Sequence, residues 1–334
     1  MKALVTGGAG FIGSELTRQL LARGDEVVVV DNLANGKLEN LSEVLSEQCR
    51  LSVTDLRDGA ALATLLAGVD VIYHLACLGV RHSIHSPIEN HEVNATATLR
   101  LLGAARAAGV SRFVYVSSSE IYGTARWAPM TEDYPPSPMT VYGASKLAGE
   151  SYARAYHRTY GYPTVMLRPF NAYGPRSHHE GDSGEVIPKF LLRALAGRDM
   201  IIFGDGTQTR DFTEVSDTAR GILLGGVAPG IEGETINIGN GTEISVNELA
   251  RLVQSVAGSP QVQIKHDEPR PGDISRLLAD TAKAKALLGY EVRVSLKEGL
   301  QRLKQWYSSQ AQSPAELLAE ETPHNWKKEV PTHV

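Results

Sequence analysis

The chain of 334 residues is long enough for one large domain or two modest ones, and its apolar content of 42% predicts an ordinary packed core. A formal net charge of −5 without a long basic run excludes a general nucleic-acid-binding protein and a protein held by charge on an anionic membrane. No apolar stretch approaches the roughly 18 residues of a membrane-spanning helix. The two cysteines, Cys49 and Cys77, form neither a disulfide framework nor a metal-ligand spacing, so we expect no metal and a cytoplasmic location.

The chain opens on a short apolar strand, Lys2 to Val5, which is unlike a signal peptide. A helical pattern follows through leucines 16, 20 and 21. Between them, the run Thr6–Gly13 places glycines at 7, 8, 10 and 13, the spacing of the dinucleotide fingerprint and of its variant. Glycines there make the tight turn, let a pyrophosphate approach the main chain, and let the helix pack closely on the strand. The helix N-terminus then favours the phosphates.

A second strand, Glu26–Val30, ends in Asp31, about 20 residues beyond the glycines. An acidic side chain at this place can accept hydrogen bonds from both ribose hydroxyls, and it would repel a 2′-phosphate. The pattern therefore predicts NAD rather than NADP.

Strands and helices alternate over the first 120 residues. Further strands are expected at 49–53, 69–75 and 112–117, and helices at 38–45, 60–66 and 90–108. This rhythm predicts an α/β fold, a Rossmann-type doubly wound parallel sheet with ligands at the carboxyl ends of its strands. Side chains expected at that edge include Asp31, Asp55, Leu75, Ala76 and residues 117–120.

The alternation weakens beyond about Pro169. Residues 171–185 are rich in Gly, Pro, His and Ser and are expected to form a long loop, followed by a helix at 187–196 and a strand at 201–203. His178, His179 and Glu180 in that loop lack the spacing of metal ligands.

The sequence thus predicts an NAD-binding domain over residues 1–170 and a smaller α/β substrate domain over 171–308. The segment 235–238 is a candidate to return to the large sheet as a strand. The polar residues 309–334 are interpreted as a mobile tail or a poorly packed helix.

Two short motifs carry the predicted chemistry. Tyr142 and Lys146 are four residues apart and share one face of a helix, where an ammonium beside a phenol lowers the pKa of the phenol. A tyrosine tuned in this way can take a proton from a substrate hydroxyl while a hydride leaves for the nicotinamide. The serine cluster 117–119 follows a predicted sheet strand, and a serine there can bond the same hydroxyl and share its proton with Tyr142.

Together, five segments resemble the extended short-chain dehydrogenase/reductases that act on nucleotide sugars. These are Thr6–Gly13, Asp31–Asn32, Ser117–Gly123, Tyr142–Lys146 and Arg168–Pro175. The resemblance covers about residues 1–305. It implies tightly held NAD, a C-terminal domain for a nucleotide-diphosphate sugar, commonly a homodimer, and transient oxidation of the sugar, commonly at C4.

The resemblance also implies roles for single residues. Ser118 would be the catalytic serine, Tyr142 the base and Lys146 its partner. Ser118, Ser119, Asn171, Arg210 and Arg270 would contact the substrate, and guanidinium groups suit its phosphate oxygens. The residues expected to contact NAD are Gly7, Gly10, Phe11, Ile12, Gly13, Asp31, Asn32, Asn35, Gly36, Asp55, Leu56, Leu75, Ala76, Tyr142 and Lys146.

Three reactions of this family remain open on the residues. A 4-epimerase needs oxidation, rotation of the 4-keto sugar and return of the hydride to the other face, for which Ser118, Tyr142 and NAD suffice. A 4,6-dehydratase also needs a base at C5, and Glu120 could be that base. A UDP-glucuronate decarboxylase needs an arginine near the carboxylate, where this chain has Leu277–Asp280 with Arg276 beside it.

The segments 31–33, 270–274 and 278–280 look most like those of the 4-epimerases. The sequence therefore predicts a 4-epimerase for a UDP-hexose or UDP-hexuronate. A non-catalytic NAD-binding protein would not need the set of Ser118, Tyr142 and Lys146, so an enzyme is favoured.

Overall fold

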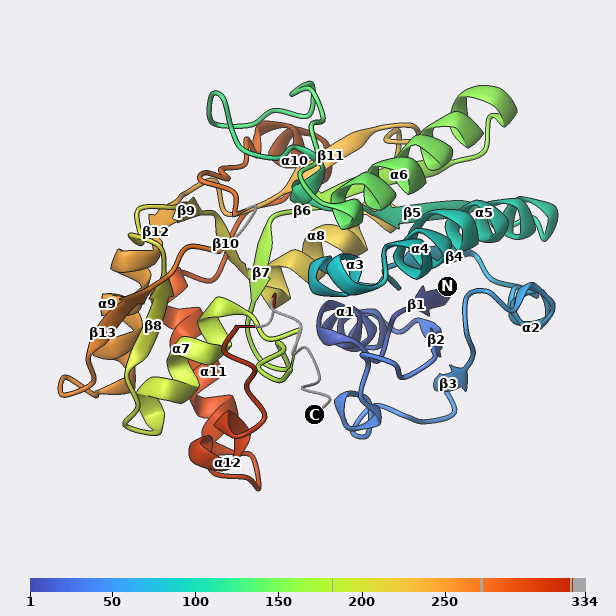
Figure 1. Ribbon diagram of the computed structural model, residues 1–334. Coiled ribbons are helices and arrows are strands. Elements are labelled where there is room, and N and C mark those ends of the chain that lie inside the picture. The colour runs from blue at the N-terminus through green and yellow to red at the C-terminus, as the bar shows by residue number, and fades with distance from the viewer. Residues whose placement is uncertain (182, 271–272, 325, 327–334) are drawn as a thin grey trace, which may run out of the picture.

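A parallel sheet of seven strands forms the larger half of the molecule (Figure 1). The computed structural model describes residues 1–181, 183–270, 273–324 and 326. The strand order is β11–β6–β5–β4–β1–β2–β3. The strands are β1 (Lys2–Thr6), β2 (Glu26–Asp31), β3 (Cys49–Val53), β4 (Val71–His74), β5 (Arg112–Val116), β6 (Thr164–Pro169) and β11 (Thr235–Ile238). The predicted doubly wound sheet is confirmed.

Helices cover both faces of this sheet, as the near-continuous apolar strands require. Successive residues of β1 point to opposite faces: Val5 packs against one helical layer and Leu4 against the other. The first layer consists of α1 (Phe11–Ala22), α8 (Val215–Val227) and α10 (Ala282–Leu288), and the second of α2 (Gly59–Leu65), α5 (Thr98–Ala107) and α6 (Val141–Tyr160). Within the described residues, no helix has the length and apolar character needed to cross a membrane.

The long helix expected at 90–108 is interrupted by a wider turn. It runs as α4 (Pro87–His91), the π-helical segment η2 (Glu92–Ala97) and α5, preceded by the short helix α3 (Val80–His85). Within η2, the Asn94 amide donates to Ser145 Oγ at 3.0 Å and to the Leu78 carbonyl at 2.9 Å. The wider turn thereby ties this helix to α6.

The prediction of a helix over residues 38–45 is wrong beyond the first turn. Only the 3₁₀ turn η1 (Leu38–Asn40) forms. The Asn40 side chain donates to the Ala9 carbonyl at 2.9 Å, and Arg18 donates to the Asn40 carbonyl at 2.8 Å. These contacts hold the segment against the glycine loop, where it cannot continue as a helix.

The smaller half has its own core and three two-stranded pairings. Leu191, Leu249 and Leu300 meet in that core. The strands β7 (Asn171–Tyr173) and β10 (Phe212–Glu214) pair in parallel, as do β8 (Met200–Phe203) and β13 (Ile264–Asp267), whereas β9 (Thr209–Arg210) and β12 (Ile244–Ser245) are antiparallel. The helices are α7 (Val186–Leu195), α9 (Val246–Ala257), α11 (Leu296–Ser308) and α12 (Pro314–Leu318).

The two halves are interleaved along the chain. The strand expected at 235–238 is confirmed as β11, which pairs in parallel with β6 and places Ile236 opposite Leu167. The helices α8 and α10 also return to cover the large sheet. Part of the second half of the sequence therefore belongs to the larger half of the fold.

The segment interpreted as a mobile tail or a poorly packed helix lies partly outside the described residues, at 325 and 327–334. In its described part, α12 begins with a capping box between Ser313 and Glu316 and buries Leu317 in the smaller core. Further on, Glu321 forms an ion pair with Arg193 of α7 at 2.7 Å.

Candidate active site

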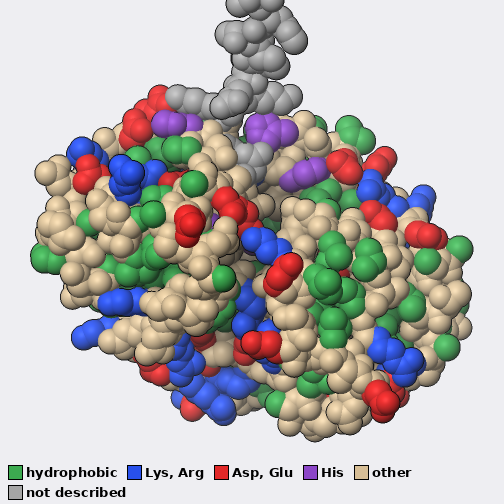
Figure 2. Space-filling model, turned by 90° about the horizontal axis from the view of Figure 1, so that it is seen from below, with side chains coloured by type: hydrophobic (Ala, Val, Ile, Leu, Met, Phe, Trp, Pro, Cys, Tyr) green, Lys and Arg blue, Asp and Glu red, His purple; other side chains and the backbone are tan. Residues whose placement is uncertain are grey.

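A cavity of about 990 Å³ lies between the carboxyl ends of the large sheet and the smaller half. Seen from below, the molecule is hollowed between two lobes, and basic and acidic side chains gather along the hollow (Figure 2). All the site residues proposed from the sequence line the cavity: Gly7, Gly10, Phe11, Ile12, Gly13, Asp31, Asn32, Asn35, Gly36, Asp55, Leu56, Leu75, Ala76, Ser118, Ser119, Glu120, Tyr142, Lys146, Asn171, Arg210 and Arg270. Its volume is at the upper end of ligand pockets, about 300–1,000 Å³.

The glycine loop leaves backbone, rather than side chains, at one wall of the cavity. Gly7 has φ of +71°, which favours glycine, and a Cβ there would lie 2.8 Å from Ala76 Cα. A Cβ on Gly13 would overlap the Gly7 carbonyl oxygen and lie 2.8 Å from Gly8 Cα. Gly10 begins α1 without a side-chain cap, so the first-turn N–H groups of that helix remain available to an anion. This wall fits a pyrophosphate.

A carboxylate stands at the end of β2, as predicted. Asp31 accepts hydrogen bonds from the backbone N–H groups of Ala9 at 3.0 Å and Leu33 at 2.9 Å. Burial raises the pKa of Asp31, while these two bonds oppose the rise. Beside it, Asn32 donates to Asp55 at 3.0 Å and joins the ends of β2 and β3. Asp31 thus stands where a carboxylate for ribose hydroxyls is predicted, whereas the Asp55 carboxylate is bound on both oxygens by Arg57, at 2.9 and 2.8 Å.

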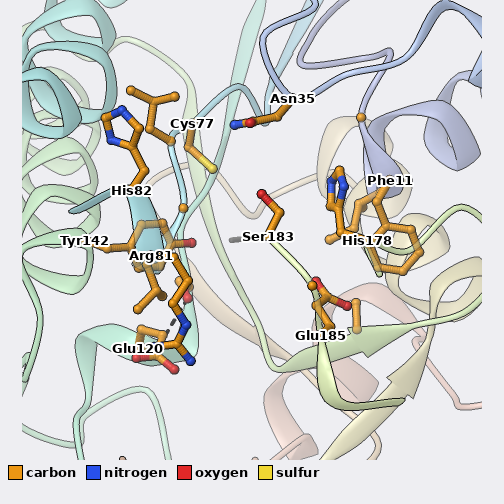
Figure 3. Close-up of a pocket in the computed structure, with 18 of the residues that line it drawn as sticks. Phe11, Asn35, Cys77, Arg81, His82, Glu120, Tyr142, His178, Ser183 and Glu185 are labelled. Atoms are coloured by element: carbon orange, nitrogen blue, oxygen red, sulfur yellow. Dashed lines mark hydrogen bonds between the residues drawn. The ribbon is translucent and has the colours of Figure 1, made fainter. Parts of the chain in front are cut away.

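Tyr142 and Ser118 both line the cavity, and Figure 3 shows Tyr142 on its wall near Arg81 and Glu120. Ser118 follows β5, and Tyr142 lies in the first turn of α6, whose start is fixed by Thr140 accepting from the Gly143 N–H at 3.0 Å. The Ser118 hydroxyl lies close enough to the Tyr142 phenol to lower its pKa, whereas the nearby Cys77 side chain raises it. A substrate hydroxyl that enters this part of the cavity meets both the phenol and the serine hydroxyl.

Lys146 lies behind this pair and is buried. Its Nζ donates to the Val116 carbonyl at 2.6 Å and lies 4.8 Å from the centre of the Tyr115 ring. Burial lowers the pKa of Lys146. Burial also raises the pKa of Tyr142 well above its ordinary value, and this effect outweighs the lowering by the Ser118 hydroxyl. The expected lowering of the phenol pKa by Lys146 is therefore not found, because desolvation is the dominant effect and Lys146 is not among the groups that shift this pKa.

Glu120 faces the cavity from η3 (Ser119–Ile121). Burial raises the pKa of its carboxyl, and the charges of Arg210 and Arg81 oppose the rise. In Figure 3, the Arg81 side chain lies beside Glu120, close to Tyr142. The acid is thus placed where it can act on a ligand.

The opposite half of the cavity is basic. Arg210 of β9 forms an ion pair with Asp273 at 2.8 Å. The Arg270 guanidinium is buried against Phe203, and its Nε has no hydrogen-bond partner among the described residues. Burial and the nearby charges of Arg81 and Arg210 lower the pKa of Arg270 to about 10. Cations with unused donors fit an anionic ligand. Residues 271–272 of the predicted motif lie outside the described residues.

Several cavity residues were missed by the sequence reasoning. Lys189 of α7 donates to the Thr322 carbonyl at 2.8 Å, and burial lowers its pKa to about 8. A single lysine on the apolar face of a predicted helix was the signal that could have found it. His178 and Glu185 lie on the wall opposite Tyr142 (Figure 3). They carried no such signal, because the loop that holds them has no periodicity.

The chain is similar to known proteins along most of its length. The family described as GDP-mannose 4,6 dehydratase matches residues 4–303. A UDP-glucose 4-epimerase of Mycolicibacterium smegmatis is 39% identical over 93% of this chain and 100% of its own length. UDP-glucuronic acid decarboxylase 1 of Arabidopsis thaliana is 36% identical over 91% of this chain and 69% of its own.

A dTDP-glucose 4,6-dehydratase from Streptomyces venezuelae, solved with NAD bound, superimposes with a TM-score of 0.86. It is 38% identical, and the match covers 92% of this chain and 97% of that one. The chain is thus similar in sequence to epimerases, dehydratases and decarboxylases of nucleotide sugars, and similar in fold to the dehydratase. The chain belongs to the same family, the nucleotide-sugar branch of the extended short-chain dehydrogenase/reductases.

Proposed function

We propose that this chain is a nucleotide-sugar 4-epimerase that acts on a UDP-hexose or a UDP-hexuronate and uses NAD. The observation that carries the proposal is that Ser118 and Tyr142 lie beside each other in one cavity, together with the glycine loop and with Arg210 and Arg270. The 39% identity to a UDP-glucose 4-epimerase along its whole length supports it.

NAD, held by the glycine loop and Asp31, would supply the hydride acceptor. The chain supplies the proton path. Tyr142 takes the proton of the sugar O4 hydroxyl, and Ser118 binds the same oxygen and relays the proton. The buried Lys146 holds the end of β5 next to α6 through its bond to the Val116 carbonyl. The pair returns the proton when the 4-keto sugar is reduced on its other face. Since one pair serves both directions, epimerisation needs no second acid or base.

The position of Arg276, the candidate arginine for a decarboxylase, does not favour decarboxylation. Arg276 lies in an outer hollow, where its guanidinium binds Glu243 with contacts at 2.9 and 3.0 Å. The side chain is 45% exposed and does not line the main cavity. It is therefore not placed to hold a sugar carboxylate beside Tyr142.

A dehydratase, which eliminates water from the sugar, is the second candidate, because Glu120 lines the cavity near Tyr142. Both candidates are tested by incubating the protein with UDP-glucose, UDP-glucuronate, UDP-GlcNAc and dTDP-glucose, followed by sugar chromatography and mass spectrometry. A product of unchanged mass and new retention supports the epimerase. Loss of water would instead establish a dehydratase, and loss of carbon dioxide a decarboxylase.

The variant Glu120→Gln separates the two candidates further. It keeps the shape and polarity of the side chain but removes the base. We expect it to retain most epimerase activity, with Glu298→Gln on the exposed face of α11 as the control. A nearly complete loss in Glu120→Gln alone would favour elimination.

A further inference from the structure

A segment near the C-terminus folds back along the rim of the cavity. We define it as the C-terminal strap, residues 320–324 and 326. The family match ends at residue 303, so the strap lies beyond the shared part of the chain. The Gly181 N–H donates to the Glu320 carbonyl at 2.9 Å, which attaches the start of the strap to the loop before α7.

The middle of the strap forms part of the cavity wall. Glu321 and Pro323 line the cavity. Arg193 and Lys189, which also line it, hold the strap through the Glu321 carboxylate and the Thr322 carbonyl. Two basic residues of α7 that face the ligand space are therefore engaged by the strap.

The end of the strap reaches the basic half of the site. His324 Nε2 lies 3.1 Å from Asp267 Oδ2 at the end of β13. The Trp326 ring packs edge-on against Phe203, with 4.6 Å between ring centres and an angle of 86°. The Arg270 guanidinium lies 5.4 Å from the centre of the Phe203 ring and 5.1 Å from that of Trp326.

Trp326 therefore packs against Phe203 and Arg270, two residues that line the basic half of the cavity. The cavity lining includes Arg270 and Phe203, whereas Trp326 is not among the described residues that line it. Two aromatic rings beside a guanidinium stabilise it and restrict its directions, and here the Nε donor is left unpaired. A fixed guanidinium with an unused donor suits a diphosphate.

We propose that the C-terminal strap is the outer wall of a nucleoside-diphosphate site, and that Trp326 is the positioning residue that fixes Arg270 and Phe203 for this ligand. The inference rests on the proposed function in its ligand class, and it adds a part of the chain that lies outside the family match. The strap retains the nucleotide half of the substrate, while Ser118 and Tyr142 act on the sugar half.

The test uses the full chain with its bound cofactor and UDP as the probe, measured by isothermal titration calorimetry. We expect Trp326→Ala to weaken UDP binding by about 5- to 30-fold, the range of one desolvated cation–π contact. Trp326→Phe keeps an aromatic ring and is expected to restore most of the affinity. The control is Trp127→Ala, which removes a tryptophan that is 54% exposed and packs on Tyr134.

Four further readouts separate positioning from a general loss of structure. NAD content and melting temperature are expected to stay unchanged in Trp326→Ala. With a turned-over sugar, KM is expected to rise while kcat stays within about twofold. The change of tryptophan fluorescence on UDP binding is expected to disappear in Trp326→Phe.

The outcomes distinguish this inference from the proposed function. Equal UDP affinity in the wild type and Trp326→Ala would overturn the role of the strap and leave the proposed function intact. Tighter binding in Trp326→Ala would also overturn it, because the strap would then compete with the ligand. A wild-type protein that does not bind UDP would contradict the UDP-sugar function and this inference with it.

Discussion

The phenol of Tyr142 and the hydroxyl of Ser118 lie beside each other in the wall of the cavity, although 24 positions separate them in the sequence. The end of β5 and the first turn of α6 bring them together. The pair is the part of the site on which the proposed chemistry depends.

The first prediction concerns Tyr142→Phe. It removes the proton acceptor, so turnover is expected to fall by about 10²- to 10⁴-fold. NAD content is expected to stay near that of the wild type. Tyr152→Phe on the same helix is the control and should remain active. Turnover of any nucleotide sugar by Tyr142→Phe at the wild-type rate would rule out the mechanism, and the measurement is the chromatographic assay.

The second prediction concerns Gly13, which packs against the glycine loop. In Gly13→Ala, the new Cβ would overlap the Gly7 carbonyl oxygen, so the loop must move. We expect loss of bound NAD, measured by absorbance after denaturation, and a lower melting temperature. Gly59→Ala is the matched control, because nothing lies within 4 Å of a Cβ at the start of α2. Normal NAD content in Gly13→Ala would contradict the close packing.

The third prediction concerns the buried ion pair of Arg168 and Glu150. Arg168 donates to both carboxylate oxygens, at 2.6 and 3.0 Å, and the side chains are 3% and 0% exposed. Burial opposes ionisation, but the contacts with Arg168 lower the pKa of Glu150. Arg168→Met leaves a buried carboxylate without its main partner and is expected to lower the free energy of unfolding by about 3–5 kcal/mol.

The control for this pair is Arg154→Ala. Arg154 pairs with the same carboxylate at 2.7 Å, but its side chain is 29% exposed, so the expected loss is about 1 kcal/mol or less. Urea denaturation measures both variants. Equal losses would show that burial of the arginine is not the deciding factor.

The fourth prediction concerns pH and Glu185. Burial raises the pKa of its carboxyl to about 7; the charge of His178 opposes this rise and that of Glu180 adds to it. Because the folded protein keeps the proton that the unfolded chain loses near 4.5, this contribution to stability is complete below that pH. It is lost as the pH rises through about 7.

Glu185→Gln has no proton to lose. Between about pH 5 and 8, the wild type is expected to lose about 1–3 kcal/mol through this group, and the variant is expected to show a flatter profile of melting temperature. Glu43→Gln, an exposed position, should follow the wild type. Parallel profiles for Glu185→Gln and the wild type would contradict the assignment.

Local patterns predicted the parts of the fold that local chemistry decides. The valines before Asp31 are buried between two helical layers, so their run is typical of a parallel strand, and the glycine spacing defines the turn before α1. Residues at strand ends could be placed at one edge because parallel strands share that edge. This reasoning located both catalytic candidates, Ser118 and Tyr142.

Long-range contacts decided the rest. The π-helical turn at Asn94 depends on Ser145, about 50 positions away, and nothing in the helical period indicates it. The pKa of Tyr142 depends on how completely the phenol is buried. The position of the strap depends on the contact between Trp326 and Phe203, and no sequence pattern relates these two residues.

The return of β11 to the large sheet also has a consequence for how such a protein can change. The chain passes between the two halves repeatedly, so the smaller half is not a continuous segment that a recombination event could transplant. New substrate preference on this framework would therefore arise by substitutions at single positions in the cavity wall, to which both halves contribute.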